Sequence, residues 1–325
     1  MLNKPDNQET IQGIQVLKKL ALLTVLVTGL LACIIWADPY AEVDIQRHIN
    51  AAILDKQALL AQTKGKKIIL VAGSNFLYGI DSDSLEKEIG LPVVNMSLPY
   101  YLGADFLLKQ IEDHLQPGDV VVMGFEFMIS RNGEMNEKML TAQFYPPAKN
   151  WIEFPTWQSR ISAPLTAYFL RIRKLISRSV SSTQVEPTVE DTTNELFRNG
   201  IDSHGDLVSQ DNNPSTGGKV IVPMNNDTDF LPVISCMDSV ARIHPQVSFF
   251  YVFPTLSESG FATDKKFITP LTKQLTKEGY SFTLINSLAD SIYPDSLFHN
   301  SPYHVTPTGR ALHTKRLAGW IKRQL

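Results

Sequence analysis

Short apolar runs alternate with longer stretches of helical spacing along most of the chain. Runs typical of buried strands occur at 68–72, 92–95, 120–124, 247–253 and 280–285. They are too short for helices, and most are rich in β-branched or aromatic residues, which is typical of strands covered on both faces. Stretches with apolar residues at helical spacing separate them. This alternation predicts βαβ units, and therefore an α/β domain with a mostly parallel sheet.

The helical spacing predicts helices at 40–63, 82–90, 102–115, 165–176, 230–243, 265–277 and 308–324. The first is amphipathic and leads away from the apolar N-terminal segment. In the last we expect Leu312, Leu317, Trp320 and Ile321 to face inward and five basic side chains, Arg310 among them, to form a solvated face. The stretch 165–176 mixes apolar, aromatic and basic residues. It is a lid, a surface for a membrane or membrane partner, or an ordinary helix with a solvated basic face.

An uncharged segment at 20–37 is long enough to cross a membrane. Its eighteen residues at about 1.5 Å each give roughly 27 Å, close to the thickness of the hydrocarbon layer. Lys18 and Lys19 precede it, whereas Asp38 and Glu42 follow it. This asymmetry predicts a single signal anchor in the bacterial cytoplasmic membrane, with 1–19 cytoplasmic and 41–325 on the extracytoplasmic, periplasmic side.

Three other interpretations of the N-terminal segment stay open: a cleaved signal peptide, a lipoprotein signal ending at Cys33, and a buried core helix. Apolar character continues past Cys33, which disfavours the lipoprotein signal. A second unusual stretch, 177–219, is polar and rich in Ser, Asn and Gly. It cannot bury much apolar area, so we expect an insert that is irregular or disordered.

Composition narrows the class of protein. With 325 residues, 43% of them hydrophobic, the chain can form one large core or two modest ones. A net charge of −3 and a pI near 6.2 argue against nucleic acid as a partner. The two cysteines, Cys33 and Cys236, exclude a disulfide framework and a cysteine-rich metal site. We expect neither a metal nor a cofactor.

The strongest candidate for chemistry is a serine paired with a late histidine. Ser74 follows the strand run 68–72, and the carboxyl ends of strands are where open α/β sheets bind ligands. His304 lies in the loop before the last helix, where it can face that edge and act as a general base. The alternative for Ser74 is that it only caps the following turn.

Several blocks of this sequence together resemble the SGNH (GDSL-like) hydrolase superfamily. They are Ala72-Gly73-Ser74-Asn75 with 78–81, the stretches 91–95 and 115–127, and Ser301-Pro302-Tyr303-His304 with 305–310. The nearest likeness is to its membrane-anchored bacterial branch, which includes proteins of the alginate O-acetylation and DltD types. The resemblance covers 66–129 and 249–325 and leaves the middle of the chain unaccounted for.

The resemblance implies a flavodoxin-like three-layer α/β/α sandwich and serine acyl-ester chemistry. It further implies O-acyl or O-acetyl transfer to an exported or cell-wall polysaccharide, beside a membrane-bound O-acyltransferase-type protein. Carried over by position, Ser74 is the nucleophile and His304 the base. The oxyanion and substrate groups would come from the Ser74 amide, from Asn75, and from the segment between Asn95 and Ser97.

This sequence departs from the family pattern at the support for His304. The family places an aspartate just before the histidine, whereas here Asn300 and Ser301 are nearby and the nearest upstream acid is Asp295. Asn300, Asp295 and Glu126 therefore stay open as the supporting residue. The alternatives to a transferase are a periplasmic esterase and a catalytically inactive relative that binds glycan or acts as a scaffold.

Overall fold

The computed structural model describes residues 7–36, 41–180, 197–208 and 230–325. Its centre is a sheet of five parallel strands in the order β2-β1-β3-β4-β6. The strands are β1 (Ile68–Val71), β2 (Val93–Asn95), β3 (Val120–Met123), β4 (Ser248–Tyr251) and β6 (Thr283–Leu284). This is the flavodoxin-like order of doubly wound sheets. A second, two-stranded sheet joins β5 (Leu256–Ser257) to β7 (Ile292–Tyr293).

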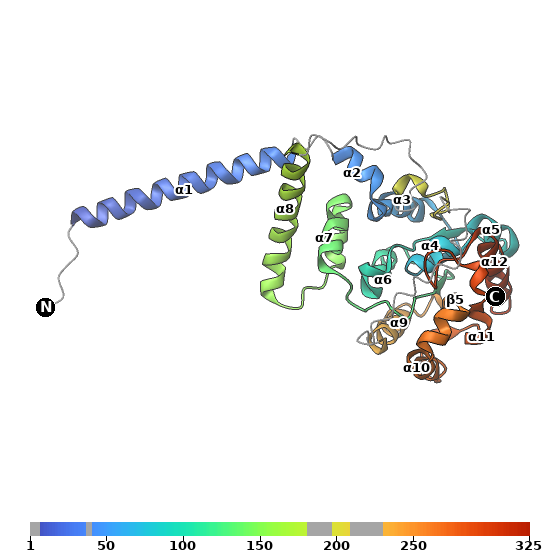
Figure 1. The fold of residues 1–325 in the computed structure, drawn as a ribbon. Helices are drawn as coiled ribbons and strands as arrows, with labels where there is room; N and C mark the ends of the chain where they lie inside the picture. The colour runs from blue at the N-terminus through green and yellow to red at the C-terminus, as the bar shows by residue number, and fades with distance from the viewer. Residues whose placement is uncertain (1–6, 37–40, 181–196, 209–229) are drawn as a thin grey trace.

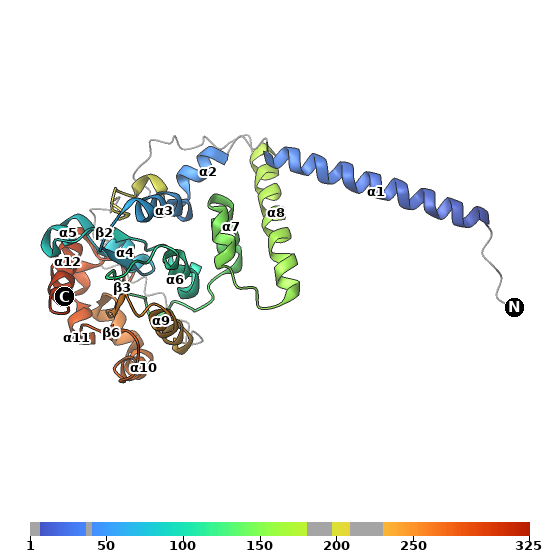
Figure 2. The same cartoon turned by 180° about the vertical axis from the view of Figure 1, so that it is seen from behind.

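Helices cover both faces of the central sheet, because alternate strand residues point to opposite sides. Ile69 and Val71 of β1 join a core cluster with α3 (Ile53–Gln62), α6 (Ala104–Glu112), α9 (Leu231–Ile243) and α10 (Glu258–Leu275). Ile68 and Leu70 join a second cluster with α4 (Ser74–Gly79), α5 (Ser82–Ile89) and α12 (Pro307–Lys322). The predicted α/β class and the three-layer arrangement are therefore confirmed (Figures 1 and 2).

The N-terminal helix α1 (Asn7–Trp36) projects away from this domain (Figure 1). Its stretch Gln12–Cys33 has a mean hydropathy of 2.0 and none of it is buried by the rest of the chain. The helix is thus long and apolar enough to cross a membrane. It begins earlier than the predicted span, and residue 37, the predicted end, lies outside the described residues.

The region after β3 forms a helical pair that the sequence pattern predicts only in part. It contains α7 (Met135–Phe144), the short helix η3 (Pro146–Trp151) and α8 (Trp157–Val180). Both views show α7 and α8 side by side, with α8 on the side from which α1 leaves (Figures 1 and 2). Helix α8 is longer at both ends than the predicted helix at 165–176.

The predicted helix at 40–63 is wrong as one continuous element. It is divided into α2 (Ala41–Arg47), η1 (Ile49–Ala52) and α3. The break falls at His48, whose extended backbone and ring nitrogen Nδ1 cap η1 by accepting from the Asn50 amide at 3.2 Å. The remaining short elements are η2 (Tyr100–Leu102), η4 (Arg198–Gly200), α11 (Leu288–Ser291) and η5 (Asp295–Leu297).

Two side chains of α12 differ from the predicted faces. Leu312 is 36% exposed, whereas Leu317, Trp320 and Ile321 are buried as expected. Arg310 is turned inward, because its guanidinium pairs with the buried Asp206 carboxylate at 3.0 Å and donates to the Ile80 carbonyl at 2.6 Å. The predicted insert at 177–219 lies largely outside the described residues. Of it, α8 continues to Val180, and 197–208 contains η4 and a bridge between Ile201 and Leu207.

Candidate active site

Ser74 stands at the carboxyl end of β1, as the strand turns into α4. Gly73 is the N-cap of α4 and Ser74 is its first residue. Its neighbours on both sides are buried, whereas Ser74 itself is half-buried and so keeps access to solvent. A hydroxyl in this position lies at the sheet edge where doubly wound folds bind ligands.

His304 is held by a closed loop between η5 and α12. Phe298 and Val305 form an antiparallel bridge across the base of the loop, and the His299 amide donates to the His304 carbonyl at 3.1 Å. Thr306 then caps α12, with Pro307 at the first helical position. The loop is thereby tied to the start of a buried helix, so His304 has a defined place at the same sheet edge.

The structure brings Ser74 and His304 together although 230 positions separate them. His304 Nε2 lies 2.8 Å from Ser74 Oγ, and Nδ1 lies 2.7 Å from Asn300 Oδ1. An amide oxygen only accepts, so Nδ1 carries the ring proton and donates it to Asn300. Nε2 then presents its lone pair to the Ser74 hydroxyl, which is the tautomer that a general base requires.

Tyr78 supports the imidazole from the other side, a contact that the sequence analysis missed. Its ring stacks on that of His304 with centroids 4.3 Å apart and an interplanar angle of 21°. Tyr78 lies one turn after Ser74 in α4, and the spacing of i and i+4 on a helix could have indicated it. Burial, with a smaller contribution from His299, lowers the pKa of His304 to about 3, so the ring is neutral at physiological pH.

Glu126, just beyond β3, binds the turn that carries the nucleophile. One carboxylate oxygen accepts from the Asn75 amide at 2.6 Å and from Ser74 Oγ at 3.2 Å. The other accepts from the Gly73 amide at 3.1 Å. Burial raises the pKa of Glu126, and these three donors oppose that shift. Ionised Glu126 competes with His304 for the Ser74 proton, whereas protonated Glu126 can itself donate to Ser74 Oγ.

Two glycines make this close approach possible. A Cβ on Gly73 would lie 2.3 Å from a Glu126 carboxylate oxygen, and one on Gly124 would lie 2.3 Å from the Phe76 ring. Both distances are far below ordinary contact. The turn after β1 and the turn after β3 therefore pack against each other only because both lack side chains at these points.

Most of the side-chain groups expected to bind the oxyanion or substrate form hydrogen bonds with other groups of the protein. The Asn75 side chain donates to the Gly124 carbonyl at 3.3 Å and accepts from the Thr255 hydroxyl. Asn95 donates to the Phe76 carbonyl at 3.0 Å, and its side-chain oxygen accepts from the Ser97 amide at 3.0 Å. Among the described residues the Ser97 hydroxyl is buried without a hydrogen-bond partner.

The backbone amides of 95–97 are also hydrogen-bonded within the protein. Asn95 and Met96 donate their backbone N–H groups to the His204 and Leu70 carbonyls, each at 2.9 Å. The segment 95–97 therefore offers no uncommitted amide for an oxyanion in this conformation. Within the described part of the chain the Ser74 amide donates to no protein acceptor, so it is the remaining backbone donor beside the hydroxyl.

A buried polar network next to β2 engages the Asn95 side chain. Asp206 accepts from Asn95 Nδ2 at 2.8 Å and from both the amide and the hydroxyl of Ser82, and it pairs with Arg310. Lys56 donates to the Asn95 and Gly205 carbonyls, and burial lowers its pKa to about 7. This network ties the segment 197–208 to the end of β2.

Of the three candidates for supporting His304, Asn300 holds the position. Asp295 instead accepts from the Ser259 amide at 2.9 Å in the first turn of α10. Glu126 contacts Ser74 rather than the imidazole. In the part of the chain that the structure describes, no group of three or more His, Cys, Asp or Glu side chains could hold a metal ion.

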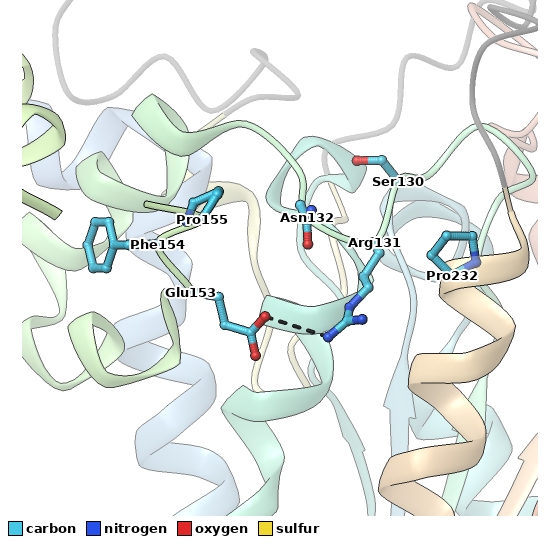
Figure 3. Close-up of a pocket in the computed structure, with 7 residues that line it drawn as sticks. All are labelled: Ser130, Arg131, Asn132, Glu153, Phe154, Pro155 and Pro232. Carbon is cyan, nitrogen blue, oxygen red and sulfur yellow. Dashed lines mark ion pairs between the residues drawn. The ribbon is translucent and has the colours of Figure 1, made fainter. Parts of the chain in front are cut away.

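An open pocket of about 470 Å³ lies beyond β3, between the segment 130–132, the segment 153–155 and the start of α9 (Figure 3). Arg131 and Glu153 face each other across it in an ion pair of 3.5 Å, and Glu153 also pairs with Lys109 at 2.7 Å. Ser74 and His304 are not among its lining residues. The pocket is thus a separate feature, and the arrangement suited to chemistry is the pair of Ser74 and His304.

The dyad has the parts that acyl-ester chemistry needs on the side of the nucleophile: an accessible hydroxyl, a neutral imidazole 2.8 Å away and an amide oxygen that orients the imidazole. Comparisons of the chain with protein-family models, with curated proteins and with solved structures give no match.

Proposed function

We propose that the protein is a membrane-anchored serine acyl-ester enzyme of the SGNH-like type. The observation that carries the proposal is the 2.8 Å contact between Ser74 Oγ and His304 Nε2, in the tautomer fixed by Asn300. Ser74 Oγ attacks the acyl carbonyl while His304 takes the hydroxyl proton. The imidazolium then gives this proton to the departing alcohol, which leaves an acyl group on Ser74. An acceptor hydroxyl completes the cycle by the reverse proton transfers.

The environment of His304 suits a base that is ready at neutral pH but weak. Its lowered pKa keeps the ring unprotonated and able to accept the Ser74 proton. The same burial makes the imidazolium that forms during attack less stable, and an amide such as Asn300 stabilises that cation less than a carboxylate does. We therefore expect slow turnover, which suits transfer to one specific acceptor more than general ester hydrolysis.

For the location we propose a single span in the bacterial cytoplasmic membrane with residues 41–325 on the periplasmic side. The support is the apolar helix α1 and the charge asymmetry between Lys18-Lys19 and Asp38. Fusing a reporter that works only in the periplasm after Leu325 should give activity. Activity of a reporter that works only in the cytoplasm would contradict this orientation.

For the reaction we propose O-acyl, in particular O-acetyl, transfer to an exported or cell-surface polysaccharide, with a membrane-bound O-acyltransferase-type protein as acyl donor. A membrane anchor raises the effective concentration of a domain near an integral membrane partner, which a free esterase does not need. Replacing Ser74 with Ala should lower the acyl content of the glycan without altering chain synthesis. Unchanged acylation would refute the transfer reaction.

Hydrolysis of small activated esters tests the chemistry itself. The full chain should release acyl groups, and Ser74→Ala and His304→Ala should each abolish the release. The double variant should lose no more than either single variant, because the two residues act as one unit. Additive losses would contradict a shared role.

A second candidate, a non-catalytic glycan-binding relative, is favoured by one observation. The Glu126 carboxylate already occupies the Gly73 and Asn75 amides beside Ser74, where a developing oxyanion would otherwise find donors. Glycan binding that survives both Ser74→Ala and His304→Ala, together with no turnover in the unsubstituted protein, would establish this candidate instead.

A further inference from the structure

Helix α8 carries an apolar face that no other described part of the chain covers. Large apolar side chains recur along it at intervals of three or four, which places them on one side of the helix. Each is between 56% and 70% exposed: Trp157, Ile161, Leu165, Tyr168, Phe169 and Ile176. Scattered apolar side chains are normal on protein surfaces, whereas a continuous stripe of this kind marks an interaction surface.

The opposite side of α8 packs against the domain. Ala163 and Ala167 are buried there, and α8 contacts α7. Leu175, which shares the side of Tyr168, is buried near the C-terminal end of the helix. Small residues on the side of Ala163 allow α7 and α8 to approach closely. The exposed stripe therefore faces away from α7 and away from the sheet, and it has no role in the core.

The position of α1 indicates what lies against this stripe. Both views show α1 meeting α8 and then running crosswise to it, on the side away from α7 (Figures 1 and 2). A membrane that α1 crosses extends crosswise to α1, so its surface passes along α8. An ion pair of 2.9 Å between Lys174 and Asp44 joins α8 to α2.

The charge of α8 fits the same occupant. The helix contains no Asp or Glu, and its exposed basic side chains include Arg160 and Arg173. Cationic side chains beside an apolar stripe, with aromatic residues within it, are the composition of helices that lie in the interface of an anionic bilayer. Trp157 and Tyr168 are the types enriched at that depth.

We propose that α8 lies in the outer interface of the membrane that α1 spans, with its apolar stripe inserted among the lipid chains. The proposal rests on the proposed span of α1. Two attachments, one crossing the membrane and one lying in its surface, fix the orientation of the domain, which a single flexible anchor does not. The sheet and the dyad then lie on the far side of α7 from the membrane-bound helix.

Spin labels on single cysteines test this in the full chain, reconstituted into nanodiscs of phosphatidylethanolamine and phosphatidylglycerol. Labels go on Leu165→Cys and Phe169→Cys, with Ser177→Cys as the control, since Ser177 is exposed on α8 outside the stripe. Cys33 is replaced by Ser in these chains, and Cys236 is buried. Oxygen concentrates in lipid and a neutral nickel chelate in water, so their relative access to the label reports depth.

At positions 165 and 169 we expect oxygen to be the more accessible reagent, and at 177 the nickel chelate. Equal, water-like access at all three positions would overturn the proposal and would favour a protein partner for the stripe. A label on native Cys33, which is exposed within α1, separates the two claims. A lipid-facing Cys33 with water-facing 165 and 169 refutes only the placement of α8, whereas a water-facing Cys33 refutes the span itself.

Discussion

Replacing Glu126 with Gln tests whether this carboxylate holds the turn that carries Ser74. Its two oxygens accept from the Gly73 amide, the Asn75 amide and Ser74 Oγ at 3.1, 2.6 and 3.2 Å. Glutamine has the same shape but only one acceptor. In either orientation its NH₂ group points at one of the two amides, so a donor faces a donor in a buried site.

The expected cost follows from the bonds that are lost. A hydrogen bond to a charged group contributes about 1.5–3 kcal/mol, and removing the buried charge returns part of that. A net loss of about 2 kcal/mol corresponds to a decrease in Tm of roughly 4–8 °C for a domain near this size. Part of the lost energy is regained because the buried charge, whose burial raises the pKa of Glu126, is no longer present.

Thermal unfolding of the full chain in detergent, followed by fluorescence, measures this change. The matched control is Glu278→Gln, because Glu278 is exposed, and it should shift the Tm by less than about 1 °C. A Glu126→Gln protein as stable as the unsubstituted one would refute the role of the carboxylate as a clamp on 73–75. In that case the hydrogen bonds to Glu126 would contribute nothing net to folding.

Two further predictions concern the histidines and their partners. Asn300→Ala removes one hydrogen bond to His304 Nδ1, so kcat for ester cleavage should fall roughly tenfold with little change in KM. Asn300→Asp should retain or raise kcat, because a carboxylate stabilises the imidazolium. Equal rates for all three proteins would contradict an orienting role. Burial lowers the pKa of His313 to about 3 in the folded protein, against about 6.5 in the unfolded chain. As the pH falls below about 6.5, the unfolded chain binds a proton at this residue and the folded protein does not. The free energy of unfolding therefore falls as the pH falls. For this one group the loss between pH 7.5 and pH 5 is about 2 kcal/mol, which urea unfolding at the two pH values measures, and His313→Gln should remove it.

The sheet was predictable because its strands carry strong local signals. Runs such as 68–72 and 120–124 combine apolar character with β-branched residues, so each indicates a buried strand by itself. Once the strands are parallel, their carboxyl ends share one edge, and Ser74 and the loop of His304 fall at that edge despite their separation in sequence. The contact of 2.8 Å between them follows from topology rather than from any local motif.

The other contacts of the site depend on where individual side chains point in space, which the pattern of apolar and polar residues along the sequence does not indicate. Glu126 reaches the amides of 73 and 75 because Gly124 lets the turn after β3 approach Phe76 closely. Arg310 looks solvated in a helical pattern, yet it pairs with Asp206, which belongs to a polar stretch with no strand or helix signal of its own. In both cases a single side chain interacts with a distant loop, so helical and strand periodicity carry no information on it.

The most direct test of the central claim is covalent labelling of the full chain with a fluorophosphonate probe, read by mass spectrometry of the peptide that contains Ser74. The probe forms a bond between phosphorus and an activated serine oxygen as fluoride departs, so it reports nucleophilic character without knowledge of the substrate. We predict an adduct on Ser74, absent in Ser74→Ala and formed at least about tenfold more slowly in His304→Ala, since one tenfold step corresponds to only 1.4 kcal/mol of activation. No adduct on Ser74, or equal labelling rates with and without His304, would contradict an activated serine at this site.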